Sequence, residues 1–164
     1  YDLTAGDWVS PHGSGRFTDI LFTKDFTKKA DNDYHYRLTL GFRNRGDGIQ
    51  AFNVPFPVTE GSELRSPHEA PIDGYQPRLV RISKSQPGQG SVFDYDENRN
   101  YFFRVRTILD EKGNLKSALY GKIYGDFMTF RYYLNVEPNS RNMEFDPKRN
   151  LLNGLRSFEM VLEP

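Results

Sequence analysis

Apolar and polar side chains alternate along much of this chain, which is the pattern of half-buried β-strands. The clearest run covers residues 34–43, where every even position is aromatic or aliphatic and every odd position is polar or glycine. We expect the even face of this strand to be buried. Residues 17–26 predict an earlier strand, and residues 49–54 and 79–82 predict two short ones.

Three further strands, over residues 101–109, 115–124 and 127–136, predict an antiparallel meander. A five-residue loop that contains a glycine joins the first two strands. The next connection is Gly125-Asp126, whose leading glycine is typical of a two-residue type II′ turn. Both connections therefore predict tight hairpins, and each hairpin predicts a register.

The two registers agree on one apolar face. The first loop places Phe103 opposite Gly121, and the second turn places Phe130 opposite the same glycine. The two rings can cover the bare glycine backbone, as in the aromatic rescue of strand glycines. Directly opposed residues share a face of the sheet. We expect these residues to be buried together: Phe103, Val105, Leu119, Gly121, Ile123, Phe130 and Tyr132.

The strands predict a single all-β domain over residues 1–164. Its expected form is an antiparallel two-sheet sandwich of jelly-roll or related Greek-key type, with at most one or two short helices. Residues 44–76 are rich in proline and glycine and predict a long irregular loop. A short helix is expected over 146–154, with Asp-Pro at its start, and a final strand over 158–162.

Composition and charge exclude several classes of protein. The chain has no cysteine, which excludes a disulfide framework, a cysteine zinc site and a thiol nucleophile. Its formal net charge is zero, so we expect no nucleic-acid partner, since such proteins usually carry a basic excess. No apolar run approaches the roughly 20 residues of a membrane span. Because the chain starts at Tyr1 and not at methionine, we expect a mature protein or a domain excised from a larger one. The expected location is outside the cytoplasm: extracellular, on the cell surface or in the periplasm.

The opposite face of the meander is the predicted binding surface. By the same registers it gathers aromatic, cationic and amide side chains. Tyrosine rings stack on sugar rings, while arginine and lysine donate hydrogen bonds to hydroxyl groups or carboxylates. The candidate ligand-binding residues are Arg104, Arg106, Tyr120, Lys122, Tyr124, Arg131, Tyr133 and Asn135.

These residues favour non-catalytic binding of a polysaccharide or oligosaccharide, by a module or a small exported protein. One alternative is a structural or interaction protein that contacts a protein partner through residues 44–76. A second is a jelly-roll polysaccharide lyase. There Tyr120 or Tyr124 would act as proton donor or base, and Arg104 or Arg131 would neutralise a uronate. The same face can instead be a solvated sheet, or it can pack under residues 44–76.

Calcium is the one cofactor that the sequence suggests. Asp94, Asp96 and Asn98 place oxygen ligands at alternate positions, as at the start of a calcium-binding loop. Position six of such a loop requires glycine and is Arg99, and position twelve requires glutamate and is Val105. A polar turn is the alternative. We expect no other cofactor and no catalytic residues, because the sequence holds no known catalytic motif.

Overall fold

The computed structural model describes residues 1–53, 67, 69–96, 98–125, 127 and 131–143. Within these residues the chain forms strands and no helix, so no helix long and apolar enough to cross a membrane occurs there. The strands are β1 (Leu21–Ala30), β2 (Asp33–Gly41), β3 (Gly48–Asn53), β4 (Arg78–Gln86), β5 (Gly90–Phe93), β6 (Arg99–Leu109), β7 (Leu115–Tyr124) and β8 (Arg131–Asn135). The helix expected over 146–154 and the strand over 158–162 lie outside the described residues.

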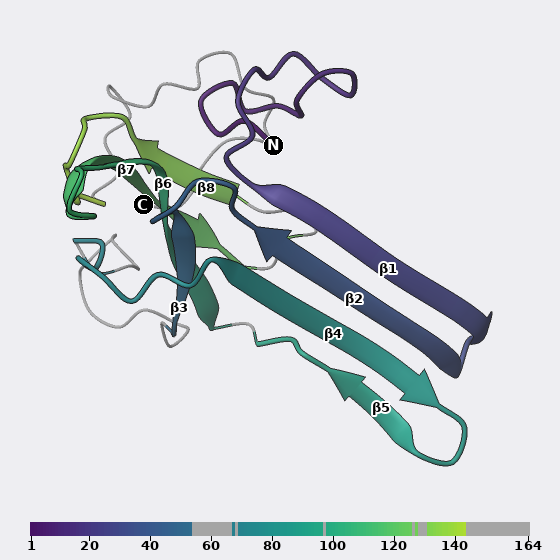
Figure 1. Ribbon diagram of the computed structural model, residues 1–164. Helices are drawn as coiled ribbons and strands as arrows, with labels where there is room; N and C mark the ends of the chain where they lie inside the picture. Colours follow the sequence, from purple (N-terminus) through teal and green to yellow (C-terminus); the bar gives the residue numbers. More distant parts are fainter. Residues whose placement is uncertain (54–66, 68, 97, 126, 128–130, 144–164) are drawn as a thin grey trace.

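The strands form two antiparallel four-stranded sheets, which confirms the expected all-β class and is consistent with a two-sheet sandwich (Figure 1). The strand orders are β1-β2-β4-β5 in the first sheet and β3-β6-β7-β8 in the second. β3 lies between β2 and β4 in the sequence but pairs with β6, so the chain crosses between the sheets on both sides of β3.

The main hydrophobic core contains residues of both sheets and of the N-terminal segment. Phe103, Val105 and Ile123 are fully buried, as expected, and Tyr132 is 7% exposed. Leu119 packs against this core. At about 25 cal/mol per Å² of apolar surface, burial of these side chains is the main stabilising contribution. The other buried members are Leu3, Ile20, Leu40, Ile49, Tyr101, Phe127 and Leu134.

The register between β6 and β7 is the one that the sequence predicts. Phe103 lies opposite Gly121, and Val105 lies opposite Leu119. A Cβ atom on Gly121 would overlap the Phe103 ring and the carbonyl oxygen of Tyr133, so only glycine fits at this position. The ring of Phe103 therefore covers the glycine backbone, as the sequence led us to expect.

The register between β7 and β8 differs from the prediction. A two-residue turn after β7 would place Phe130 opposite Gly121, whereas Leu134, four residues further along, lies there. Phe127, in the longer connection, packs into the core with 8% of its surface exposed. A shift by an even number of residues keeps the side chains of β8 on their predicted faces, whereas Phe127, predicted opposite Tyr124 on the ligand face, lies in the core. Phe130 lies outside the described residues.

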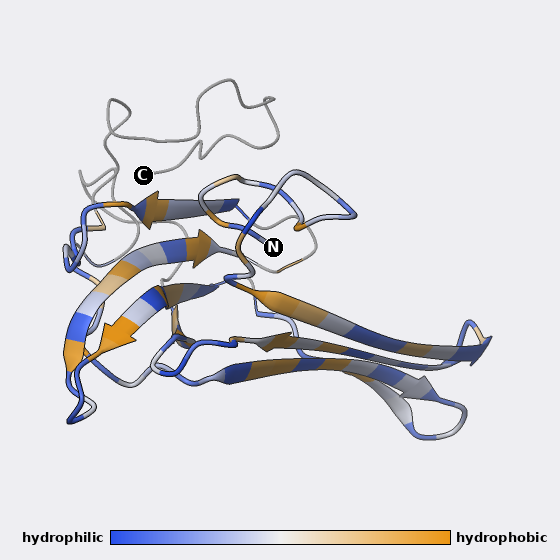
Figure 2. Ribbon diagram, turned by 45° about the horizontal axis from the view of Figure 1, so that its top comes forward, coloured by the Kyte–Doolittle hydropathy of each residue, from blue (hydrophilic) through white to orange (hydrophobic). Residues whose placement is uncertain are grey.

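The first sheet projects well past the second (Figures 1 and 2). The expected strand over 34–43 is β2, where Leu40 is fully buried and Leu38 packs against the core. Farther from the core the sheet is open, and β1 is exposed at every residue after Phe22. β5 was not predicted, and β1 runs four residues beyond its expected end at residue 26.

Candidate functional site

The face of the second sheet that was expected to bind ligand is covered. Tyr120, Lys122, Tyr133 and Asn135 are at most 8% exposed. Side chains from residues 44–76 pack on this face and form a second hydrophobic cluster with it. The expectation of an open binding surface is therefore wrong, because these aromatic rings present too large an apolar area to remain in water. The alternative that this face packs under residues 44–76 is confirmed for their described part.

Arg104 ties the covering segment to the sheet. Its Nε donates a hydrogen bond to the carbonyl oxygen of Gly46 at 2.8 Å, and its Nη1 donates one to that of Ile72 at 3.1 Å. The guanidinium lies 4.9 Å from the centre of the Tyr75 ring. Arg104 thus holds Gly46, Ile72 and Tyr75 against β6, which accounts for its place on this face without a ligand.

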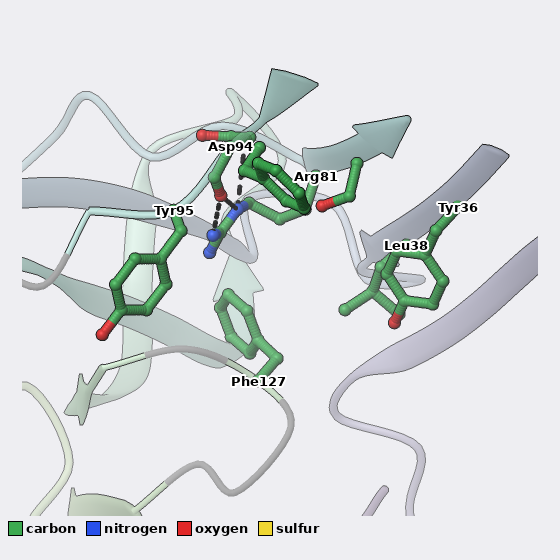
Figure 3. Close-up of a pocket in the computed structure, with 8 residues that line it drawn as sticks. Tyr36, Leu38, Arg81, Asp94, Tyr95 and Phe127 are labelled. Carbon is green, nitrogen blue, oxygen red and sulfur yellow. Dashed lines mark hydrogen bonds and ion pairs between the residues drawn. The ribbon is translucent and has the colours of Figure 1, made fainter. Parts of the chain in front are cut away.

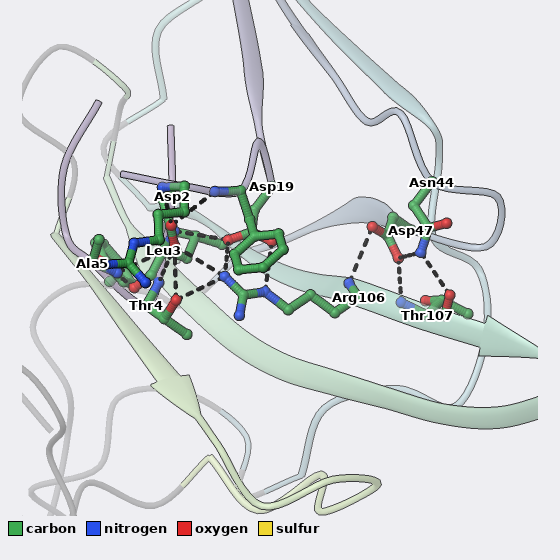
Figure 4. Close-up of polar contacts among 12 residues, drawn as sticks. Asp2, Leu3, Thr4, Ala5, Asp19, Asn44, Asp47, Arg106 and Thr107 are labelled. Atoms are coloured by element: carbon green, nitrogen blue, oxygen red, sulfur yellow. Dashed lines mark hydrogen bonds and ion pairs between the residues drawn. The ribbon is translucent and has the colours of Figure 1, made fainter. Parts of the chain in front are cut away.

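Arg106 is turned away from the predicted binding surface by a β-bulge. The register of β6 shifts between Val105 and Ile108, and Arg106 has a φ of 54°. Its guanidinium reaches the N-terminal segment, where it donates to Asp19 at 3.0 Å and to Asp2 at 2.9 Å (Figure 4). The placement of Arg106 beside Arg104 is therefore wrong, since strict alternation ends at a bulge.

The Asp2 carboxylate is the centre of this polar network. It accepts hydrogen bonds from the backbone N–H groups of Arg16 at 2.9 Å and Phe17 at 3.0 Å, and from the Thr4 hydroxyl at 2.7 Å. Burial alone would raise the pKa of Asp2, but these hydrogen bonds outweigh it and hold the pKa below its usual range. The network anchors the N-terminal segment to β6.

Lys122 is fully buried, and its Nζ has no hydrogen-bond partner within the described part of the chain. The Nζ atom lies 5.1 Å from the centre of the Tyr124 ring and 5.9 Å from that of Tyr133. Burial lowers the pKa of Lys122 to about 8. Tyr124 lies opposite Arg131 at the end of the sheet, and both are half-buried. Of the predicted binding residues that lie on this face, these two and Arg104 retain partial exposure.

The residues considered for calcium make other contacts. The Asp94 carboxylate forms ion pairs with Arg99 at 2.6 Å and with Arg81 at 3.1 Å. Asp96 accepts a hydrogen bond from the backbone N–H of Asn98 at 3.0 Å. Among the described residues no group of three or more histidine, aspartate or glutamate side chains is placed to hold a metal ion. One carboxylate of this segment thus serves two guanidinium groups.

A pocket of about 210 Å³ lies on the side of the first sheet that faces the core (Figure 3). Arg81 and Asp94 supply its charged groups. Arg81 donates to the backbone carbonyl of Asp94 and, at 3.1 Å, to the Tyr101 hydroxyl. Tyr95 is 65% exposed, so its ring stands at the rim. The remaining lining residues are Tyr36, Leu38, Ser83, Phe93 and Phe127.

The pocket opens onto a row of side chains that crosses the whole first sheet. Phe26, Tyr36, Ser83 and Phe93 lie opposite one another on β1, β2, β4 and β5, and we call them the aromatic row. Phe26 is 52% and Phe93 is 62% exposed. Neighbouring strands lie about 4.8 Å apart, so the row spans about 14 Å. This length suits an extended ligand.

A basic row lies beside the aromatic row, one step closer to the core. It consists of Lys24, Leu38 and Arg81, which face one another across β1, β2 and β4. The Lys24 Nζ lies 5.6 Å from the centre of the Tyr36 ring and 5.7 Å from that of Phe26. The ammonium group and the rings therefore share one open face of the sheet.

The lysines of β1 indicate this site in the sequence, although the alternation in residues 34–43 alone predicts a buried face there. The even face of residues 34–43 was expected to be core, which placed Tyr36 in the interior. On the same face, however, Lys24 and Lys28 alternate with phenylalanines in β1. Lysines on a face that should be buried indicate that the sheet extends beyond its core. The protein-interaction surface expected over 44–76 lies partly outside the described residues, which omit 54–66 and 68.

Comparisons with protein-family models, with curated proteins and with solved structures found no match for this chain. Its function is therefore inferred from the geometry of its own surface. That surface combines exposed rings, hydroxyl groups and cations on one face of the first sheet.

Proposed function

We propose that this chain binds carbohydrate without catalysis, on the aromatic row and in the pocket beside it. The observation that carries this proposal is the placement of Phe26, Tyr36 and Phe93 in one row, with Tyr95 at the pocket rim. Exposed rings of this kind are costly to leave in water, and they offer flat apolar faces on which a sugar ring can stack.

Polar groups among the rings support a sugar over a purely apolar ligand. Ser83 lies within the aromatic row, and the Ser91 hydroxyl donates to the Ser85 hydroxyl at 2.9 Å in the next row. Arg81 adds a guanidinium at the pocket wall. Hydroxyl and guanidinium groups exchange hydrogen bonds with sugar hydroxyls while the rings cover the apolar face of the sugar.

The pocket chemistry favours binding over hydrolysis. Glycoside hydrolysis ordinarily needs two carboxyl groups, one on each side of the scissile bond. Among the described residues that line the pocket, Asp94 is the one carboxylate, and two guanidinium groups hold it. Both oxygen atoms of this carboxylate are engaged by these cations, and no second carboxylate stands across the pocket among the described lining residues.

A glycan array followed by titration of the bound glycans tests the proposal. Tyr36→Ala and Phe93→Ala should each weaken binding about tenfold, corresponding to about 1.4 kcal/mol for a ring that contacts the ligand. Phe17→Ala is the matched control, because Phe17 is 61% exposed, close to the 62% of Phe93. Phe17 lies in the N-terminal segment, away from the aromatic row, where its ring contacts the guanidinium of Arg106.

The control variant should bind as tightly as the wild type. If the wild type binds no glycan, the proposal fails. It also fails if Phe93→Ala and Phe17→Ala weaken binding equally, because the aromatic row would then have no particular role.

A further inference from the structure

The face of the first sheet that carries the aromatic row is positively charged. Within the four strands its charged side chains are Lys24, Lys28 and Arg81, and it bears no carboxylate. The acidic residues of β1 and β2, Asp25 and Asp33, lie at alternating positions that point to the opposite face. The opposite face also carries Arg37, Arg78 and Lys84, so the two faces differ in their carboxylates and not in their number of cations.

Among the described residues, two positive charges on this side of the sheet are not offset by a nearby carboxylate: that of Lys24 and one of the two at the pocket. Lys24 forms no ion pair within the described part of the chain, and its ammonium lies over the rings of Phe26 and Tyr36. At the pocket, Arg81 and Arg99 share the single carboxylate of Asp94, which leaves an excess of one positive charge. Lys28 pairs with Asp31 at 2.6 Å, so its charge is offset.

We propose that the ligand of this face is an acidic polysaccharide, whose carboxylate or sulfate groups lie beside Lys24 while its sugar rings stack on the aromatic row. This inference rests on the proposed function and adds the charge of the ligand. The cations stand at the margin of the row, so a polymer lying along the rings brings its acidic groups to them without burying either charge.

A single-stranded nucleic acid also combines anionic groups with flat rings, but the charge here is too small to favour it. Proteins that bind nucleic acid neutralise many phosphates, often six to ten or about that number. This face offers Lys24 and a shared excess charge at the pocket, in a chain with no net positive charge. An acidic sugar polymer, with its lower charge density, matches this face better.

The test compares polymers that differ only in charge. Polygalacturonate is titrated beside its methyl-esterified form, and dextran sulfate beside dextran. We expect the charged member of at least one pair to bind more tightly, and the pair that responds identifies carboxylate or sulfate. Lys24→Gln should weaken binding of that polymer about two- to fivefold, as expected for an exposed charge contact. Binding of the neutral member should not change.

Lys84→Gln is the matched control, since Lys84 is exposed on β4 but at a position that points to the opposite face. Equal losses in Lys24→Gln and Lys84→Gln overturn the inference. Binding of neutral glycans only also overturns it, yet leaves the proposed function standing if Tyr36→Ala still weakens that binding. Tighter binding of an oligothymidylate than of either acidic polymer overturns it in favour of nucleic acid. If no polymer and no arrayed glycan binds, both proposals fail.

Discussion

Lys122 shows how strongly a single residue can depend on its surroundings. On the printed sequence it is one lysine in an alternating strand, and the alternation places it on the binding face. In the fold its ammonium lies between two tyrosine rings with all its surface buried. A cation–π contact replaces only part of the hydration that a buried ammonium loses. The residue therefore lowers the stability of the folded state at neutral pH.

Replacing Lys122 with methionine should stabilise the protein by about 1–3 kcal/mol at pH 7, since apolar replacements of buried charges are often stabilising. The pKa of Lys122 is lowered to about 8 in the folded state, against about 10.4 in the unfolded state. Between these values the unfolded state binds more protons, so the stability of the wild type should rise with pH from about 8 and level off above about 10. The variant should lack this rise.

Urea unfolding at a series of pH values measures this effect as the difference between the two proteins. We compare the two proteins because burial raises the pKa of Tyr75 and Tyr132 in both. The effect of these tyrosines on the free energy of unfolding therefore cancels in the difference. Lys84→Met serves as the control for loss of an exposed lysine. A constant difference across pH 7–10 would show that Lys122 does not titrate in this range.

At the scale of the secondary-structure elements, the bulge in β6 decides where Arg106 goes. One irregular residue with positive φ ends the alternation and directs the guanidinium toward the N-terminal segment. Asp2 and Asp19, each with 3% of its side chain exposed, depend on that guanidinium for compensation. The pKa of Arg106 is raised by its hydrogen bond to Asp19, so its charge is permanent. The bulge therefore joins the N-terminal segment to the second sheet.

Arg106→Met should destabilise the protein by about 2–4 kcal/mol. Loss of one partner of a fully buried ion pair costs about 3–5 kcal/mol, and the value is lower here because the Arg106 side chain is 29% exposed. Arg37→Met, at an exposed position of β2, should change stability by no more than about 0.5 kcal/mol. The midpoints of urea unfolding measure both effects. A loss no larger than that of the control would assign the anchoring of the N-terminal segment to other contacts.

At the scale of the whole molecule, the two sheets are covered to different extents. Strands β6 and β7 have a hydrophobic cluster on each face. The far ends of β1, β2, β4 and β5 project past the second sheet (Figure 2), and β1 beyond Phe22 and all of β5 are exposed. Few buried contacts hold these ends, so they belong to the part of the fold that opens with the least free energy. The proposed ligand surface lies on this projecting sheet.

Amide hydrogen exchange should reveal this difference. Peptides covering residues 24–36 should exchange faster than peptides covering 101–105 and 118–123, because local opening of the projecting sheet exposes little apolar surface. Mass spectrometry of the exchanged protein gives the comparison directly. Equal protection in the two regions would mean that the sheets open together as a single unit. A bound glycan should slow exchange in β2 and β5, where the aromatic row lies.

The sequence by itself determined the features that depend on neighbouring residues and short hairpins. Alternation located most strands, and the loop around Gly113 set the register that brings Phe103 over Gly121. These features follow from local chemistry, because the side-chain period of a strand and the geometry of a tight loop need no distant partner. The same logic was insufficient after β7, where Phe127 enters a core made by residues far away in the chain.

Only the tertiary structure decided which faces are covered and which remain open. Tyr120 and Tyr36 both sit in alternating strands, yet Tyr120 is buried by residues from 44–76 while Tyr36 lines an open pocket. Alternation distinguishes the two faces of a sheet but not which of them meets another layer, or where that layer ends. Those outcomes arise from long-range contacts, which is why the expected ligand surface became a second core and the projecting sheet became the candidate site.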